Sequence, residues 1–511
     1  MPEDSLKKRY FFKLSTNLIS LIINFATQAI IPRGLGPKAY GDFNFLTSFF
    51  NEISAFFDMG TSTCFYTKLS QRPKEFGLVL FYSYIVGVVS LGIIVFVIFS
   101  SLTSIHSGLW PGQKLLYIYL AAGWGILIWI VQVLCKMADA YGLTIPMEKI
   151  RILQKFLGLI FIFLLFVFHQ LHLKQFFFYH YLILLFLIAA LVWTIVKSEF
   201  SFKKIGELPK NQFKMYFKEF YAYSHPLFSY AIVGLLVGIF DRWLLQYYGG
   251  SIQQGFYGLS YQIGALCFLF TSAMTPLLTR EFSIAFGNND VTQMALLFRR
   301  YIPMLYSIAA YFSCFIAMQA DKVIYIFGGS KYKEASIAVA IMAFFPIHQT
   351  YGQLSGSVFY ATGQTSLYRN IGVTSMLIGL PVTYFLIAPG DKWGINAGAT
   401  GLAIKMVLLQ FIAINVQLYF NSKYLKFSFK RYLGHQIFSV GCLLTVAFLA
   451  TIGVDRVLGF REAIIPSFLL AGFFYTIMVI GLFYCLPIIF GLKRQDIEWI
   501  RYRIKKIRIK D

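Results

Sequence analysis

The chain of 511 residues contains little charge and few of the residue patterns that soluble enzymes use for chemistry. Charged residues make up 13% of the sequence, whereas hydrophobic residues make up 58%. The dipeptide Gly-Lys does not occur, which excludes a Walker A loop. The six cysteines lie singly, without metal-ligand spacing. These absences argue against a soluble enzyme, a P-loop ATPase and a cysteine metal centre.

Long apolar segments fill most of the sequence instead. Fourteen of them follow one another between Leu14 and Phe490, and each approaches the length of about 20 residues that crosses a bilayer as a helix. Segments 81–100 and 157–168 are apolar on every face, unlike the alternating strands of a membrane barrel. We therefore expect an all-α integral membrane protein. The predicted spans are 14–32, 41–66, 76–103, 114–137, 150–168, 177–196, 220–247, 255–279, 300–320, 335–360, 367–388, 395–420, 433–452 and 464–490.

The net charge of +23 reflects membrane orientation rather than nucleic-acid binding. With the N-terminus inside, about 32 of the 45 Lys and Arg residues fall on cytoplasmic segments, as the positive-inside rule requires. Both termini are therefore predicted to be cytoplasmic, and the first helix to serve as an uncleaved signal. The basic tail 493–510 is interpreted either as an interfacial segment on anionic lipid or as a regulatory tail.

Two pairs of segments resemble each other at nearly constant offset. Ala140-x-Gly142-x-Thr144 corresponds to Ala361-x-Gly363-x-Thr365, an offset of 221, and Gly41 aligns with Gly255 at an offset of 214. This pattern predicts two parallel six-helix repeats, as in transporters with two related lobes. We expect an N-terminal lobe (1–200, helices 1–6), a C-terminal lobe (201–425, helices 7–12), and helices 13–14 with the basic tail (426–511).

Polar side chains within the predicted spans are the candidate functional residues, because a charge at a helix centre costs about 2.5–3.5 kcal/mol on insertion scales. They concentrate in helices 1, 2, 7 and 8, as a cavity between two lobes would require. For the carboxylates, uptake of a proton or Na⁺ and simple neutralisation of a cation are both open, and Asp241 beside Arg242 could instead form an interfacial pair. The candidates for cavity polarity or ion coupling are Asn24, Gln28, Glu52, Asp58 and Asp241.

Three cations in or beside the spans suit an anionic substrate. Arg33 ends helix 1, Arg242 lies in helix 7, and Lys405 lies ten residues inside helix 12, deep for a snorkelling side chain. A diphosphate would be held by the forked donors of Arg and the point charge of Lys. We therefore predict that Arg33, Arg242 and Lys405 bind a substrate diphosphate.

Residues for catalysis are scarce. His169, His172 and His180 cluster near one predicted outer loop, but that loop has no carboxylate to pair with them. The outer loops are too short for the acid-bearing domain that a membrane polymerase or glycosyltransferase usually carries. We predict that the protein is not an enzyme and that it holds neither a metal nor a cofactor.

Six loop sequences follow one another in a characteristic order: RGLGPKAYGDFNF (33–45), FFDMGTST (56–63), DRWLLQYYGG (241–250), GFYGLSYQI (255–263), IYIFGGSKYKEA (324–335) and FYATGQTSLYRN (359–370). The set spans helices 1 to 12, and its order is more specific than any one motif. This ordered set resembles the polysaccharide flippases, the O-antigen (Wzx-type) transporters of the multidrug/oligosaccharidyl-lipid/polysaccharide exporter superfamily.

The resemblance implies a fourteen-helix, two-lobed flippase of the bacterial cytoplasmic (inner) membrane. Such a protein would move an undecaprenyl-diphosphate-linked oligosaccharide outward by alternating access, for O-antigen or capsule synthesis, driven by a cation gradient (H⁺ or Na⁺) or the membrane potential. Its partners would include membrane lipids, a polysaccharide polymerase and chain-length proteins. The alternatives are a drug/cation antiporter or a lipid II flippase of the same superfamily, or a membrane-embedded polysaccharide polymerase.

Overall fold

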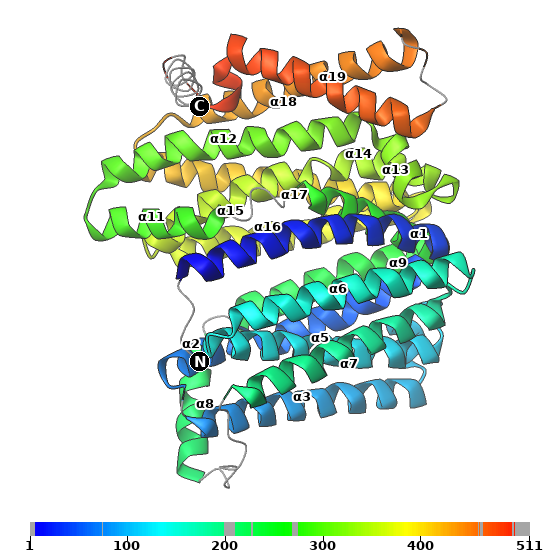
Figure 1. Ribbon diagram of the computed structural model, residues 1–511, viewed down its shortest axis with the longest axis vertical. Coiled ribbons are helices and arrows are strands. Elements are labelled where there is room, and N and C mark those ends of the chain that lie inside the picture. Colours follow the sequence, from blue (N-terminus) through cyan, green and yellow to red (C-terminus); the bar gives the residue numbers. More distant parts are fainter. Residues whose placement is uncertain are drawn as a thin grey trace. The chain divides into compact units, whose positions relative to one another are not determined.

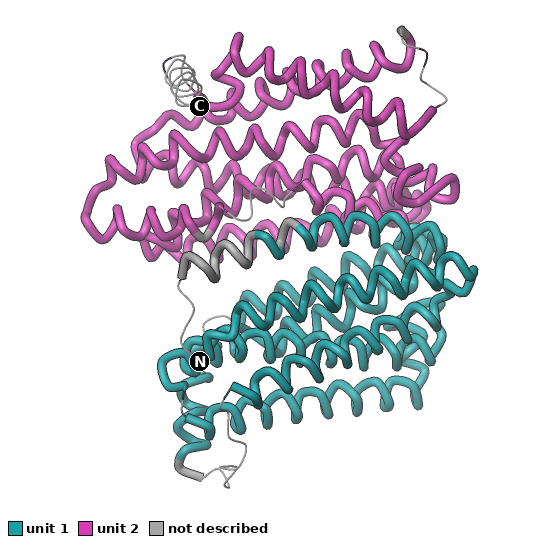
Figure 2. The backbone as a smooth tube through the Cα atoms, viewed as in Figure 1, with its two compact units in different colours: residues 1–255 teal, residues 256–511 magenta. Residues whose placement is uncertain are grey.

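A computed structural model describes residues 6–73, 75–198, 210–225, 228–267, 274–457, 459, 463–492 and 495. These residues are almost entirely helical and include no strand (Figure 1). The chain divides into two compact units, residues 1–255 and 256–511 (Figure 2). This division follows contacts within the fold, whereas the lobe boundaries given above follow the internal repeat, so those boundaries stay a prediction.

The first unit contains nine helices among its described residues, the last of which continues into the second unit. They are α1 (Leu6–Asp58), α2 (Thr61–Gln71), α3 (Phe76–Leu102), α4 (Ile105–Leu109), α5 (Leu115–Ala140), α6 (Thr144–Val167), α7 (Leu173–Lys197), α8 (Lys210–Ser224) and α9 (Phe228–Leu266).

The second unit holds the remaining described elements, several of them short. They are α11 (Thr275–Gly287), α12 (Val291–Met318), α13 (Ala320–Gly328), η3 (Ser330–Ala335), α14 (Ser336–Met342), α15 (Phe345–Ala361), α16 (Thr365–Ile387), η4 (Gly390–Lys392), α17 (Gly398–Tyr424), α18 (Phe429–Ile452), the π-helical η5 (Gly453–Val457), α19 (Ile464–Cys485) and η6 (Pro487–Phe490).

The predicted membrane architecture is confirmed, because the described residues of each of the fourteen predicted spans are almost entirely helical. Residues 226–227 of span 220–247 and 268–273 of span 255–279 lie outside the described residues. Ten described helices are long and apolar enough to cross a bilayer on their own: α3, α5, α6, α7, α9, α12, α16, α17, α18 and α19. The other predicted spans correspond to the two halves of α1, to the second half of α9 with α11, and to α14 with α15. The fold is therefore that of an all-α, multi-pass membrane protein.

Two of the long helices bend sharply at a glycine. The backbone of α1 leaves helical geometry at Gly36 (φ 73°, ψ 168°), and α9 does so at Gly250 (φ 68°, ψ −174°). An L-residue with a Cβ atom rarely adopts a positive φ, whereas glycine does so without steric cost. Each kink joins two predicted spans, helices 1 and 2 in α1 and helices 7 and 8 in α9.

The two kinks contact each other reciprocally, backbone against backbone. A Cβ atom on Gly41 would lie 1.7 Å from the carbonyl oxygen of Ser251, and one on Gly255 would lie 2.1 Å from the carbonyl oxygen of Pro37. Gly41 and Gly255 are repeat equivalents, and so are Pro37 and Ser251, since both pairs are 214 positions apart. The contact of Gly41 with Ser251 is therefore repeated by the contact of Gly255 with Pro37, with the roles of α1 and α9 exchanged. Such an exchange is the signature of a local two-fold relation.

Glycines in other connections follow the same repeat. Gly112 and Gly329, each in the connection before the fourth predicted span of a repeat, have φ angles of 70° and 71°. Gly142 and Gly363, in the connection after that span, have φ angles of 73° and 71°. Glycines at corresponding connections of the two predicted repeats therefore share the same backbone conformation.

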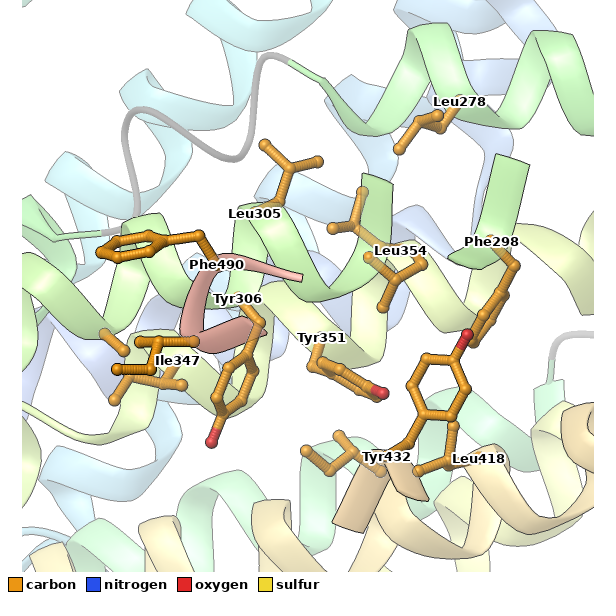
Figure 3. Close-up of a cluster of buried hydrophobic side chains, with 14 of the residues drawn as sticks. Leu278, Phe298, Leu305, Tyr306, Ile347, Tyr351, Leu354, Leu418, Tyr432 and Phe490 are labelled. Carbon is orange, nitrogen blue, oxygen red and sulfur yellow. The ribbon is translucent and has the colours of Figure 1, made fainter. Parts of the chain in front are cut away.

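The second unit has a large apolar core around its aromatic residues. Tyr306 of α12, Tyr351 of α15 and Tyr432 of α18 are all buried within it (Figure 3). The rings of Tyr306 and Tyr351 meet edge to face with their centroids 5.3 Å apart, an arrangement that aromatic pairs favour. This core ties helices of the repeat, α12 and α15, to helices 13 and 14, which are α18 and α19.

A polar cluster reinforces that attachment. Lys322 of α13 donates to both carboxylate oxygens of Asp455 in η5, at 2.7 and 2.8 Å, and to the hydroxyl of Ser467 in α19, at 2.7 Å. Ser467 in turn donates to Asp455. Because Lys322 and Asp455 are both largely buried, with side chains 13% and 19% exposed, loss of one charge would leave the other poorly solvated.

The kink contact predicts a strong penalty for a side chain at either crossing glycine. Gly41→Ala and Gly255→Ala should each destabilise the protein by about 1–3 kcal/mol or more, because the obstructing atoms are backbone and cannot rotate away. Thermal unfolding of the purified protein in detergent would measure the effect. Gly92→Ala in α3 is the control, since nothing lies within 4 Å of a Cβ there. Equal stability of all three variants would contradict the reciprocal contact.

The ion pair between Lys322 and Asp455 predicts a second effect on stability. Asp455→Asn should cost up to about 3–5 kcal/mol, since it leaves the Lys322 ammonium without its counter-charge in a largely buried site. Asp391→Asn, at an exposed position in η4, should leave the unfolding temperature nearly unchanged. The same assay in detergent would compare the two variants, and a similar small shift in both would show that the pair contributes little.

Candidate functional site

The kink contact is surrounded by a network of polar side chains. Asp42 of α1 accepts hydrogen bonds from the amide of Gln113, at 2.7 Å, and from the hydroxyl of Ser251. The amides of Gln113 and Gln246 also donate to the Ser251 hydroxyl, at 3.4 and 3.2 Å. Four side chains from α1, α9 and the segment before α5 therefore converge where the two kinks meet.

The connection between α3 and α5 holds one side of this network. The indole of Trp243 donates to the carbonyl of Gly108 at 2.7 Å, and Gln246 donates to the carbonyl of Pro111 at 3.1 Å. Both donors lie on α9 just before its kink. Side chains of α9 thus satisfy two carbonyl groups of this irregular connection.

Arg242 is anchored inside the same region by the second half of α9. Its Nη1 donates to Oε1 of Gln254 at 3.2 Å, and the Gln254 amide donates back to the carbonyl of Arg242. Its charge also acts on the buried hydroxyl of Tyr40, which lies in α1 beyond the kink. Arg242 therefore bridges the two halves of α9 and faces α1.

The structure brings three of the predicted site residues together within the first unit. The carboxylate of Glu52 in α1 interacts electrostatically with the charges of Arg242 and Asp241. Asp241 is 8% exposed, and Glu52 is half-buried. A glycine makes this approach possible, because a Cβ atom on Gly238 would lie 2.6 Å from the carboxyl carbon of Glu52.

The chemistry open to this cluster follows from its charges. Two carboxylates share the field of one guanidinium, so full ionisation would leave a net negative charge in a poorly hydrated place. Carboxylate oxygens are ligands for small, hard cations. Uptake of a cation by this cluster stays a prediction.

Asp58 has a different environment from Glu52 and Asp241. Its carboxylate accepts hydrogen bonds at the start of α2, from the backbone N–H of Ser62 at 3.1 Å and from its hydroxyl at 2.7 Å. The hydroxyl of Tyr82 in α3 donates to it at 3.3 Å, and Lys136 of α5 donates to Ser62. These contacts make Asp58 a junction of α1, α2, α3 and α5, and its part in ion coupling stays a prediction.

The remaining candidates of helix 1 lie before the kink. Arg33 and Asn24 are exposed within the first unit, and Gln28 is half-buried. The amide oxygen of Gln28 has no hydrogen-bond partner among the described residues, and the same holds for the amide oxygens of Gln113 and Gln246. A water molecule or a donor group of a bound ligand would satisfy these buried acceptors.

Lys405 belongs to the second unit and is buried there, with 4% of its surface exposed. It lies where α16 and α17 pack together. Gly379 of α16 makes room for it, since a Cβ atom there would lie 3.0 Å from Cε and 3.4 Å from Nζ of Lys405. Arg33 and Arg242 fall in the first unit, so the joint binding of a diphosphate by all three cations remains a prediction.

Sequence reasoning overlooked the residues that complete the site. Asp42 directly follows the crossing Gly41, and Ser251 directly follows the kinked Gly250. In the sequence, these two polar residues could have been identified from their position next to glycines that belong to the internal repeat. Of the three histidines, His180 of α7 is half-buried, with its ring stacked on Phe43 at a centroid distance of 4.9 Å. It is therefore a packing residue within the first unit.

The approach of Glu52 to α9 predicts a functional effect without any change of charge. Gly238→Ala should displace the Glu52 carboxylate from Arg242 and reduce transport severalfold, because the added methyl group would occupy its position. Gly234→Ala, one turn earlier on α9, has nothing within 4 Å of its Cβ and should be nearly silent. Transport per molecule inserted in the membrane is the measurement, and equal activity of the two variants would remove Glu52 from the site.

Comparisons with known proteins agree with this architecture. Residues 6–282, more than half of the chain, match the family described as polysaccharide biosynthesis protein. No curated protein matches the sequence. A solved lipid II flippase, MurJ in an inward closed conformation, is similar with a TM-score of 0.66 and 14% identity, over 93% of this chain and 98% of that one.

Transporters of the MOP superfamily are similar over a shorter part of the chain. An inward-facing multidrug resistance MATE family transporter has a TM-score of 0.56 and 16% identity, over 81% of this chain and 98% of its own. A MOP superfamily transporter from Pyrococcus furiosus has a TM-score of 0.51 and 15% identity, over 83% and 98%. The fold is thus that of MOP-superfamily transporters, and the chain belongs to the polysaccharide biosynthesis protein family.

Proposed function

We propose that this protein is a flippase for an undecaprenyl-diphosphate-linked oligosaccharide. It would move this lipid from the cytoplasmic to the outer leaflet of the bacterial cytoplasmic membrane, with both of its own termini in the cytoplasm. The product would feed a cell-surface polysaccharide, O-antigen or capsule, through a polymerase and chain-length proteins.

The observation that carries the proposal is the family match combined with the extent of the flippase-like fold. The similarity to the lipid II flippase covers 93% of this chain, whereas the similarity to the multidrug transporter covers 81%. Membership of a family described as polysaccharide biosynthesis protein supports a saccharide rather than a drug as the substrate. Together these findings favour a lipid-linked saccharide as the substrate class over a multidrug substrate.

The charges of the site fit such a substrate. Arg33 and Arg242 can offer forked donors to a diphosphate, and Lys405 can offer a buried ammonium. Glu52 and Asp241 beside Arg242 would take up the H⁺ or Na⁺ that drives the cycle. Alternating access would follow from movement of the two pseudo-symmetric repeats, as in other transporters built from repeats.

Deletion of the gene tests the substrate class. We expect completed oligosaccharide on undecaprenyl diphosphate to accumulate in the inner leaflet of the deleted host, because the step that exposes it outside is missing. Completed units that reach the outer leaflet but fail to lengthen would point instead to a polymerase. A normal lipid profile with altered drug or cation tolerance would favour an antiporter.

Substitution of the cations tests the site. In the deleted host, Arg242→Gln and Lys405→Met should each reduce export about tenfold or more, since a hydrogen bond to a charged group contributes about 1.5–3 kcal/mol. Arg369→Gln, at an exposed position of α16, is the control. Full export by both site variants, at equal amounts in the membrane, would remove the diphosphate assignment but leave the fold unaffected.

A further inference from the structure

A basic pocket of about 710 Å³ lies within the second unit, apart from the proposed substrate residues. The beginning of α12, the connection between α17 and α18, the beginning of α18 and the segment around η6 form its walls. Its lining includes Arg299, Lys426 and Arg431 and no carboxylate. Aromatic and aliphatic side chains, such as Phe427 and Phe438, complete the walls.

The three cations line the same pocket and are all exposed. Arg299 Nη2 contacts the carbonyl of Lys426 at 3.4 Å, which holds the connection between α17 and α18 close to α12. The charges of Arg299 and Arg431 both act on the hydroxyl of Tyr432. Among the described residues none of the three cations has an acidic partner. Mutual repulsion therefore opposes this arrangement unless an anion offsets it.

His435 also lines the basic pocket, and its ring is held by a hydrogen-bonded carbonyl group behind it. The carbonyl of Ile489 in η6 receives hydrogen bonds from Ser307, at 2.6 Å, and Ser439, at 2.8 Å, and contacts His435 Nε2 at 3.0 Å. With Nε2 donating to this carbonyl, Nδ1 of His435 becomes an acceptor. It is buried and has no partner among the described residues, so a hydroxyl of a bound head group would satisfy it.

Beside the basic pocket lies a larger and more apolar one, of about 1500 Å³. It shares Arg299 and Lys426 with the first, so the two spaces adjoin the same cations. Its other lining residues include Leu296, Met304, Ile308, Phe483 and Phe490. A ligand with an anionic head and long apolar chains matches this pair of spaces, whereas a free inorganic anion would leave the second one unused.

The position of the two pockets also favours a lipid. They lie at the ends of α12, α17, α18 and α19, all of which are long and apolar enough to span a bilayer. The predicted orientation places these ends at the cytoplasmic leaflet, where anionic lipids create a negative surface potential. Basic pockets between membrane helices on that side are typical sites for phospholipid head groups.

We propose that Arg299, Lys426 and Arg431 form a binding site for the phosphodiester head group of an anionic glycerophospholipid, whose acyl chains occupy the adjoining apolar pocket. This phospholipid would be a resident lipid of the surrounding membrane rather than the transported substrate, since none of these residues belongs to the proposed diphosphate site. The bound lipid would contact α12 as well as helices 13 and 14 (α18 and α19), outside the apolar core that these helices share.

Native mass spectrometry of the purified full chain in detergent tests this site. Titration with phosphatidylglycerol should give one strongly preferred bound lipid, and phosphatidylcholine should not. Arg299→Gln and Arg431→Gln should each weaken that binding about fivefold, the effect expected for one cation near an anionic lipid surface. The exposed Arg369→Gln is the matched control and should bind like the parent protein.

Three results would overturn the proposal. Equal binding of phosphatidylglycerol and phosphatidylcholine would remove the charge selectivity. An equal loss in Arg369→Gln would show that total charge rather than the pocket decides binding. Displacement of the lipid by inorganic phosphate at similar concentration would identify a free anion as the ligand. Lys426→Gln offers a further variant if either arginine substitution prevents isolation of the protein, and it should weaken binding by a similar factor.

Discussion

The structure depends on the close backbone contact between two kinked helices. Gly41 lies against the carbonyl of Ser251, and Gly255 lies against the carbonyl of Pro37, with no space for a Cβ atom on either glycine. This contact brings the kinks of α1 and α9 together and assembles Asp42, Gln113, Ser251 and Gln246 around them. The charged cluster depends on the same contact. Glu52 lies on α1 after its kink and Arg242 lies on α9 before its kink, so the contact of the kinks brings their charges together.

The sequence predicted the architecture well because bilayer physics limits the choices. A span must be an apolar helix of sufficient length, so hydropathy placed all fourteen segments on helices of the structure. The offsets of 214 and 221 predicted two repeats but not the backbone angles of their glycines; the structure adds that Gly36 and Gly250, and likewise Gly142 and Gly363, share a positive φ. The merging of helices 1 and 2 into α1 was not predictable, since a single glycine can make either a loop or a kink.

Prediction of the site was less complete, for a physical reason. Hydropathy identifies costly polar residues such as Glu52, Asp241 and Arg242, which the structure does bring together. It does not reveal the hydrogen-bond partners of each polar residue, so the contacts of the Asp58 carboxylate at the start of α2 were not foreseen. Gly238 carries no signal of its own. Its importance lies in the space that it leaves for Glu52.

The proposed function is the movement of a lipid-linked oligosaccharide between leaflets. The most direct measurement uses vesicles that contain the purified protein and a labelled undecaprenyl-diphosphate oligosaccharide placed in one leaflet. Under an imposed cation gradient, a membrane-impermeant lectin or glycosidase should gain access to the label on the opposite side, and protein-free vesicles should show no such access. Absence of movement under H⁺ and Na⁺ gradients and a membrane potential, by protein that is folded and inserted, would contradict the account.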